Sequence, residues 1–143
     1  MIGKLLLLLG AGYLVVTPLQ NHKAVEEDWK TIEGTWIPVT FELSGQKLPE
    51  EALKDTKLVL TDGRYTYQND QGTYKLMPGE KPRAMDIIGV DGPNKGKTFL
   101  AIYDLTGDTL RICYDLGGKT RPSEFTSRPG TKQFLASYKR AKS

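Results

Sequence analysis

Histidine and cysteine are nearly absent from this chain, and their scarcity excludes several kinds of chemistry. Among 143 residues there is one histidine, His22, and one cysteine, Cys113. A single cysteine cannot form an internal disulfide, so packing must stabilise the fold, and Cys113 in "LRICY" is best interpreted as a small hydrophobe in a sheet. One histidine, near the N-terminus, cannot supply a triad, a proton relay or a histidine-ligated metal site. We predict no metal and no cofactor.

A strong excess of charge of either sign is also missing. Removal of residues 1–24 takes away Lys4 and Lys23 and leaves 18 basic and 17 acidic residues. This balance is not that of a nucleic-acid-binding protein, and we expect no nucleic-acid partner. The chain is more basic after Gly117, which we interpret as a solvated face in preference to an anion or membrane site.

The only long apolar run is at the N-terminus. Lys4 precedes apolar residues from Leu5 to about Leu19, a pattern more typical of a secretory leader than of a membrane-spanning helix. The cleavage signal ending at Ala24 is weak, because His22 stands where a small residue is preferred. We therefore predict that residues 1–24 are a signal peptide or an uncleaved N-terminal anchor, which would be the chain's only membrane contact. Residues 25–143 are then one exported domain, in the periplasm or cell envelope or secreted.

Extended helical patterns are lacking after the leader. A short helix is expected in residues 25–34, which end on a glycine, and a helical turn in residues 48–55, with Pro49 as its first residue. Turn signals such as Asp62-Gly63 separate the remaining chain into hairpins. The eight strands predicted in this way lie near residues 36–43, 56–61, 64–68, 72–77, 84–90, 97–105, 109–115 and 132–140.

Consecutive antiparallel strands without intervening helices indicate an all-β up-and-down barrel or a sandwich. An eight-stranded barrel removes every sheet edge and has an interior that side chains or one small ligand can fill. In the first strand the alternation predicts that Ile37, Val39, Phe41 and Leu43 share one face. "FLAIYDL" (99–105) is apolar on both faces, so its second face is expected to pack against the helix, a partner or a membrane.

The stretch "IEGTW" (32–36), after a short helix and at the start of the first strand, resembles the glycine-x-tryptophan signature of the lipocalin superfamily. This resemblance implies that Gly34 turns the backbone into the strand, that Trp36 closes the base of the barrel, and that Arg140 from the last strand forms a cation–π contact with the tryptophan. Pro38 departs from a regular strand and predicts a bulge or an edge position.

The resemblance extends over about residues 29–140. The motifs "LPEEALKDTKLVL", "GTYKL", "GPNKGKTFLAIYDLTGDTLRICYD" and "RPSEFTS" are similar to a family of uncharacterised lipocalin-like domains found mainly in planctomycete bacteria. That family implies an eight-stranded lipocalin-like barrel, closed at one end by the short helix, and export from the cytoplasm. It implies no activity.

Enzyme chemistry is not indicated by any motif. "DGPNKGKT" (91–98) lacks the first glycine of a phosphate-binding loop and continues into a strand instead of a helix. The carboxylates Glu42, Asp86 and Asp104 lie on predicted strands beside polar neighbours and are better interpreted as exposed than as an acid and base pair. We predict no catalytic residues and no enzyme.

Ligand binding is the function with the clearest physical basis. Tyrosines recur on successive strands, and their rings, each with one polar edge, suit a mainly apolar pocket. We predict a monomer that binds a small apolar or amphipathic molecule. The alternatives are that tyrosines merely fill the barrel, or that a filled barrel docks a protein or envelope polymer through "RPSEFTSRPG" (121–130). The candidate ligand-binding residues are Tyr65, Tyr67, Tyr74, Tyr103, Tyr114 and Tyr138.

Overall fold

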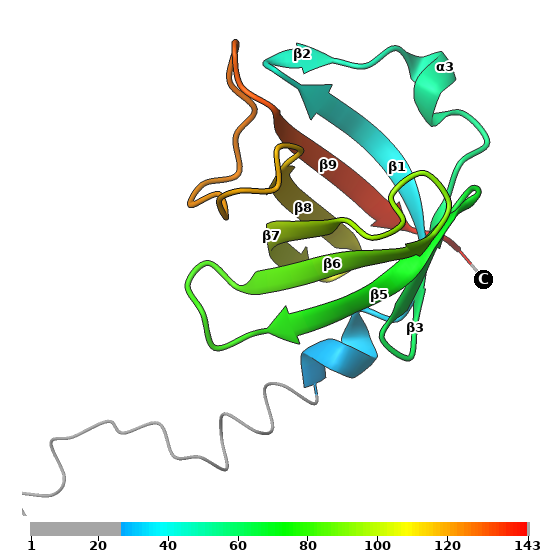
Figure 1. The fold of residues 1–143 in the computed structure, drawn as a ribbon. Coiled ribbons are helices and arrows are strands. Elements are labelled where there is room, and N and C mark those ends of the chain that lie inside the picture. The colour runs from blue at the N-terminus through cyan, green and yellow to red at the C-terminus, as the bar shows by residue number, and fades with distance from the viewer. Residues whose placement is uncertain (1–26, 143) are drawn as a thin grey trace, which may run out of the picture.

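The computed structural model describes residues 27–142, which form one closed antiparallel β-barrel (Figure 1). From β3 to β9 each strand pairs with the next, and β9 returns to pair with β1. The ring has eight strands, and the two-residue β2 is an extra strand on β1. The elements are β1 (Gly34–Leu43), β2 (Gln46–Lys47), α3 (Glu50–Leu53), β3 (Leu58–Thr61), β4 (Arg64–Tyr67), β5 (Asp70–Met77), β6 (Ala84–Asp91), β7 (Thr98–Thr106), β8 (Thr109–Asp115) and β9 (Gln133–Arg140).

The predicted all-β barrel is confirmed, and each of the eight predicted strands is present with small shifts at its ends. The turn at Asp62 and Gly63 has φ values of 51° and 74°, as a two-residue hairpin loop with two positive φ angles requires. Sequence reasoning missed β2, which is too short to show a period. The second helical turn is shorter than predicted, and Pro49 precedes α3 as its N-cap instead of opening it.

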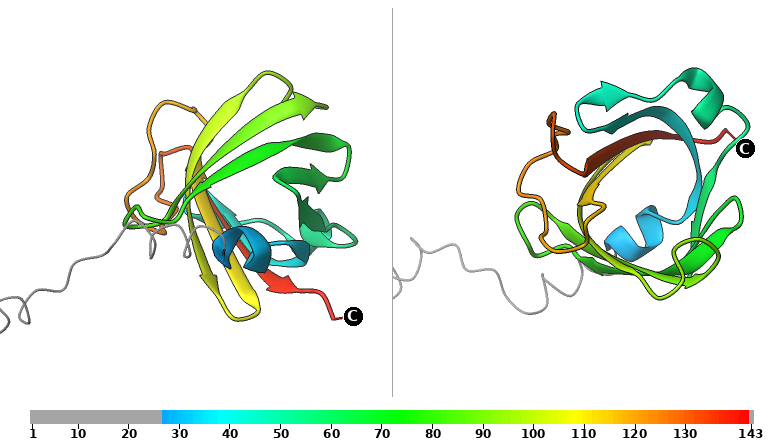
Figure 2. Two further views of the ribbon diagram at one scale, coloured as in Figure 1. Left: turned by 90° about the horizontal axis from the view of Figure 1, so that it is seen from below. Right: turned by 45° about the horizontal axis from the view of Figure 1, so that its top comes forward.

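The short N-terminal helix is seen in part. Residues 27–31 are helical and lie across one end of the ring of strands (Figure 2). The start of the predicted helix and the whole predicted leader, residues 1–24, lie outside the described residues. Within the described part of the chain, no helix is long and apolar enough to cross a membrane.

The predicted common face of the first strand is wrong. A register shift between Pro38 and Thr40 marks the bulge expected near the proline. Such a bulge inserts one residue and reverses the inward and outward alternation beyond it. As a result Ile37 and Val39 are 41% and 55% exposed, whereas Phe41 is buried inside the barrel.

The second apolar face of β7 is covered by the protein itself. The long connection between β8 and β9, residues 116–132, crosses the outer wall (Figure 1). Ile102 and Cys113 on this wall are 1% and 0% exposed, and the Cys113 thiol lies 3.4 Å from the Thr126 carbonyl oxygen. We predicted that this face packs on the helix, a partner or a membrane, but a loop of the same chain covers it.

Arg121 fixes this connection to the wall. Its Nη1 donates to the carbonyl oxygens of Met85 and Ala101 at 3.1 and 2.7 Å, and its Nη2 lies 2.7 Å from Asp86 Oδ1. The buried Pro122 follows it directly. Part of "RPSEFTSRPG" is therefore directed at the barrel and not at solvent.

Candidate functional site

The base of the barrel is closed by Gly34, Trp36 and Arg140, which the structure brings together. Trp36 is fully buried, and its indole nitrogen donates to the Ile32 carbonyl at 2.9 Å. The Arg140 guanidinium lies 4.3 Å from the Trp36 ring centroid. A Cβ on Gly34, whose φ is +139°, would lie 2.9 Å from Arg140 Nη1. The backbone angle thus favours glycine here, and a side chain would also displace the arginine beside it.

A second group of contacts at the base was missed by sequence reasoning. The Tyr103 hydroxyl donates to Asp28 Oδ2 at 2.5 Å, and Arg83 forms an ion pair with the same carboxylate oxygen at 3.2 Å. Arg83 also pairs with Asp104 at 3.3 Å and lies over the Tyr103 ring. Burial, with the nearby Asp28, raises the pKa of Tyr103 well above its ordinary value. No spacing links residues 28, 83 and 103, so only the fold could bring them together.

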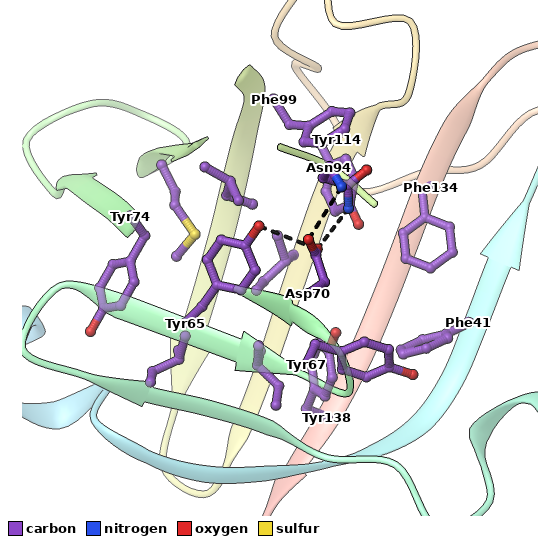
Figure 3. A pocket seen from close by; sticks show the side chains of 15 residues that line it. Phe41, Tyr65, Tyr67, Asp70, Tyr74, Asn94, Phe99, Tyr114, Phe134 and Tyr138 are labelled. Atoms are coloured by element: carbon purple, nitrogen blue, oxygen red, sulfur yellow. Dashed lines mark hydrogen bonds between the residues drawn. The ribbon is translucent and has the colours of Figure 1, made fainter. Parts of the chain in front are cut away.

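Above this base the barrel encloses a cavity of about 230 Å³ (Figure 3). Five of the six predicted ligand-binding tyrosines line it. Tyr103 is the exception, because its hydroxyl is held by Asp28 at the base. The lining residues are Phe41, Leu58, Leu60, Tyr65, Tyr67, Asp70, Tyr74, Met85, Ile87, Asn94, Phe99, Ile112, Tyr114, Phe134 and Tyr138.

The cavity reaches solvent at the end away from Trp36. Tyr67, Asp70, Asn94 and Phe134 line it and are only half-buried, whereas Tyr74 on its inner side is 4% exposed and stacks on Trp29 of the helical residues at 5.4 Å. The cavity therefore has a closed floor and an accessible mouth.

Aromatic rings form most of the cavity wall. Phe41 lies 5.2 Å from Phe134 and 6.3 Å from Tyr67, and Tyr114 lies 5.4 Å from both Phe99 and Phe134, measured between ring centroids. These rings are tilted against one another, as favoured by their quadrupoles. The tilt presents both faces and edges around the cavity.

One polar cluster interrupts this wall. Asp70 Oδ2 accepts hydrogen bonds from Asn94 Nδ2 at 2.7 Å and from the Tyr65 hydroxyl at 3.2 Å, and Asp70 Oδ1 accepts one from the Asn94 backbone at 3.3 Å. Figure 3 shows the three side chains converging from different segments. Asp70 begins β5 and Asn94 lies in the β6–β7 loop. Both stand in stretches that the sequence marked only as turns, and nothing there indicated a shared site.

Burial keeps four of the cavity tyrosines, Tyr65, Tyr74, Tyr114 and Tyr138, neutral at physiological pH. Burial, with the Asp70 charge, raises the pKa of Tyr65 to about 12, and burial raises the pKa of Tyr74 to about 12. Burial likewise raises the pKa of Tyr114 and of Tyr138 above the ordinary value. Ionisation of these four hydroxyls is therefore disfavoured, and Tyr65 uses its protonated hydroxyl to donate a hydrogen bond to Asp70.

Tyr74 differs from the other cavity tyrosines. Its hydroxyl is buried and has no hydrogen-bond partner among residues 27–142. Figure 3 shows this hydroxyl pointing away from Tyr65 and Asp70. The Tyr74 ring therefore forms part of the floor of the cavity, and the Tyr74 hydroxyl is not part of the polar cluster at the mouth.

The carboxylates considered for acid and base chemistry do not form a pair. Asp86 is bound to Arg121 on the outer wall, and Asp104 is bound to Arg83 and Arg111. In residues 27–142, no group of three or more histidine, cysteine, aspartate or glutamate side chains is placed to hold a metal ion. The arrangement with the clearest chemical use is the aromatic cavity with its single polar cluster.

Comparisons of this chain with protein-family models, with curated proteins and with solved structures found no match.

Proposed function

We propose that this chain is a lipocalin-like protein that binds a small apolar or amphipathic molecule inside its barrel. The observation that carries the proposal is the aromatic cavity of about 230 Å³ with one polar cluster at its mouth. Ligand sites commonly combine an apolar wall with a few polar groups that fix orientation. Pockets for drug-sized ligands usually span about 300–1,000 Å³, so the ligand is a smaller molecule, of the size of one substituted ring.

The base and the mouth of the barrel support this use. Trp36, Arg140 and the helical residues close the base, which leaves the opposite end as the entrance. A floor of packed rings and an accessible mouth suit a molecule that enters with its apolar part first. The polar cluster then meets whatever polar group the molecule carries.

Family and location form part of the proposal. The closed barrel with Gly34, Trp36 and Arg140 at its base supports membership of the lipocalin-like family that the sequence resembles. The N-terminal apolar segment supports export to the periplasm or cell envelope, or secretion. We propose a monomeric binding protein without enzymatic activity.

The binding proposal is tested by filling the cavity. Ile87 lines it, whereas the next residue, Ile88, is 40% exposed on the outer face of β6. Binding of benzyl alcohol to the full chain is followed by shifts in the amide signals of the protein in NMR spectra. Ile87→Trp is expected to abolish the shifts of residues that line the cavity, and the matched Ile88→Trp is expected to leave them unchanged. Equal binding by both variants would refute a ligand site in the barrel.

Export is tested separately. Expression of the full chain in a bacterium, followed by cell fractionation and intact-mass measurement, is expected to place the protein outside the cytoplasm. A mass that begins after Ala24 identifies a cleaved leader, and a full-length mass in the membrane fraction identifies an anchor. Full-length protein in the cytoplasm would contradict the proposed location.

The alternative, a filled barrel that docks a protein or an envelope polymer, has less support. It requires a packed interior and a free surface at residues 121–130. The interior instead contains the cavity, and Arg121, Pro122 and Phe125 are held against the barrel, the last of them by Arg111 at 4.3 Å.

A further inference from the structure

We propose that the molecule bound in the barrel is a small organic cation, an amine or ammonium compound carrying an apolar group, with its charge placed at Asp70. This inference rests on the proposed function, since it specifies the ligand of the same cavity. It starts from the position of one carboxylate within a wall that is otherwise aromatic and aliphatic except for Asn94.

Asp70 is the only charged residue that lines the cavity in the described part of the chain. None of the lining residues is a lysine, an arginine or a histidine, and Asp70 forms no ion pair with any residue in the range 27–142. Two other half-buried aspartates, Asp28 and Asp86, each have an arginine partner, whereas Asp115 does not line the cavity and accepts a hydrogen bond from the Gly117 backbone. Asp70 is therefore a half-buried negative charge whose neighbours supply hydrogen bonds but no positive charge.

The carboxylate retains capacity to accept a further hydrogen bond. Oδ2 accepts from Asn94 Nδ2 and Tyr65, but Oδ1 accepts only the longer bond from the Asn94 backbone, at 3.3 Å. An ionised carboxylate offers about four acceptor positions, so one on Oδ1 remains open. An ammonium group can occupy it with a charge-assisted hydrogen bond, which is stronger than a bond between neutral groups.

The surrounding rings favour the same charge. The faces of aromatic rings carry negative potential and attract cations, and Tyr65, Tyr67 and Tyr114 are all within the wall that contains Asp70. The negative charge of Asp70 acts on this wall, because it contributes to raising the pKa of both Tyr65 and Tyr114. An anionic ligand would meet this potential without a compensating positive group, so a carboxylate or phosphate is disfavoured.

Asp70 also has a structural role, which the test must separate from ligand binding. Its bonds to Asn94 join the start of β5 to the β6–β7 loop. Asp70→Asn preserves the shape of the side chain and one acceptor oxygen while it removes the charge. Asp91→Asn is the matched control, because Asp91 is exposed at the end of β6 and the substitution changes the net charge equally.

The experiment compares two probes of the same size that differ in charge. Benzylammonium and benzyl alcohol are titrated separately into the full chain, and the dissociation constants are obtained from NMR shifts at neutral pH. The unmodified chain and Asp91→Asn are expected to bind benzylammonium about tenfold more tightly than benzyl alcohol, as one charge-assisted hydrogen bond implies. In Asp70→Asn the two probes should bind equally, with the benzyl alcohol constant unchanged.

The outcomes separate the two proposals. If benzyl alcohol binds and benzylammonium binds no more tightly, the cation inference is overturned and the binding function stands. If Asp70→Asn weakens both probes alike, Asp70 acts by holding the loop, and the inference is again overturned. If neither probe binds to the unmodified chain, both proposals fall.

Discussion

Arg140, near the C-terminus, lies 4.3 Å from the ring of Trp36, near the start of the barrel, and donates to the carbonyl oxygens of Glu33 and Thr31 at 2.9 and 2.7 Å. These carbonyls lie at and just after the end of the helical residues 27–31, where a positive charge is favoured. One side chain thus joins the last strand, the first strand and the helical residues that cover the base.

Replacement of Arg140 is expected to destabilise the barrel. Arg140→Met loses the hydrogen bonds and the cation–π contact, and should lower the free energy of unfolding by about 1–3 kcal/mol, measured by urea denaturation. Lys139→Met is the control, since Lys139 is the exposed neighbour on the same strand. Equal losses in the two variants would contradict a closing role for Arg140.

Gly72 is expected to tolerate no side chain. A Cβ there would lie 2.0 Å from the Ile88 carbonyl oxygen and 2.5 Å from the Tyr65 ring, whereas a Cβ on Gly79 meets nothing within 4 Å. Gly72→Ala should therefore lower the free energy of unfolding by about 1–3 kcal/mol, and Gly79→Ala should change it by less than about 0.5 kcal/mol. Thermal and urea unfolding of both variants check this, and a neutral Gly72→Ala would show that β5 and β6 separate easily.

Removal of the Tyr74 hydroxyl and removal of the Tyr65 hydroxyl are expected to change the free energy of unfolding differently. The Tyr74 hydroxyl is buried without a partner among the described residues, and the Tyr65 hydroxyl donates to Asp70. Tyr74→Phe should leave the free energy of unfolding unchanged or raise it by up to about 1 kcal/mol, whereas Tyr65→Phe should lower it by about 1 kcal/mol. A larger loss in Tyr74→Phe than in Tyr65→Phe would mean that the Tyr74 hydroxyl has a partner in solution.

The stability of the protein is expected to fall at alkaline pH. The pKa of Tyr65 and that of Tyr74 are each raised from 10.0 to about 12 in the folded state. As pH rises above 10 the unfolded chain loses these protons first, so ionisation favours unfolding. The contribution is complete below pH 10 and is lost between about pH 10 and 12. Urea unfolding at pH 9 and pH 11 measures it, and Tyr65→Phe should show a smaller difference between the two. If Tyr65→Phe lost as much stability between pH 9 and pH 11 as the unmodified chain, ionisation of Tyr65 would not contribute to the loss.

The thiol of Cys113 is expected to be unreactive in the folded protein. It is fully buried under residues 116–132, and burial raises its pKa, so the thiolate that reacts is scarce. Arg121→Ala releases this segment from the wall and should increase the rate of modification by a thiol reagent by at least about tenfold. Arg128→Ala is the control, because its ion pair with Glu124 is exposed. Equal rates in the two variants would show that Arg121 does not hold the segment.

Much of the fold could be predicted because the signals were local. A strand in a barrel wall needs alternating apolar residues, and a two-residue hairpin needs residues such as Asp62 and Gly63 that adopt positive φ. The faces of β1 could not be predicted from alternation alone. Pro38 indicated a bulge, but the reversal that leaves Val39 outside and Phe41 inside depends on how β1 pairs with β9.

The candidate site was predictable only in its aromatic part. Tyrosines that alternate with polar residues must point inward if the wall is closed, and five of the six line the cavity. Tyr103 is in a strand that is apolar on both faces, and it lies at the base, where its hydroxyl is bonded to Asp28 and Arg83 lies over its ring. Asp70 and Asn94 are 24 positions apart, in two turns whose approach depends on the register of β5 and β6.

The sequence by itself determined the positions of the strands, the turns and the apolar and aromatic character of the interior, because each depends on neighbouring residues along the chain. The contact of Arg140 with Trp36 was implied by the family resemblance and is present in the structure. Tertiary structure alone placed residues 116–132 on the outer wall and Asp70 among rings without a positive partner. Strand tilt, register and bulges determine which side chains come into contact, and these features are set only when the whole sheet closes.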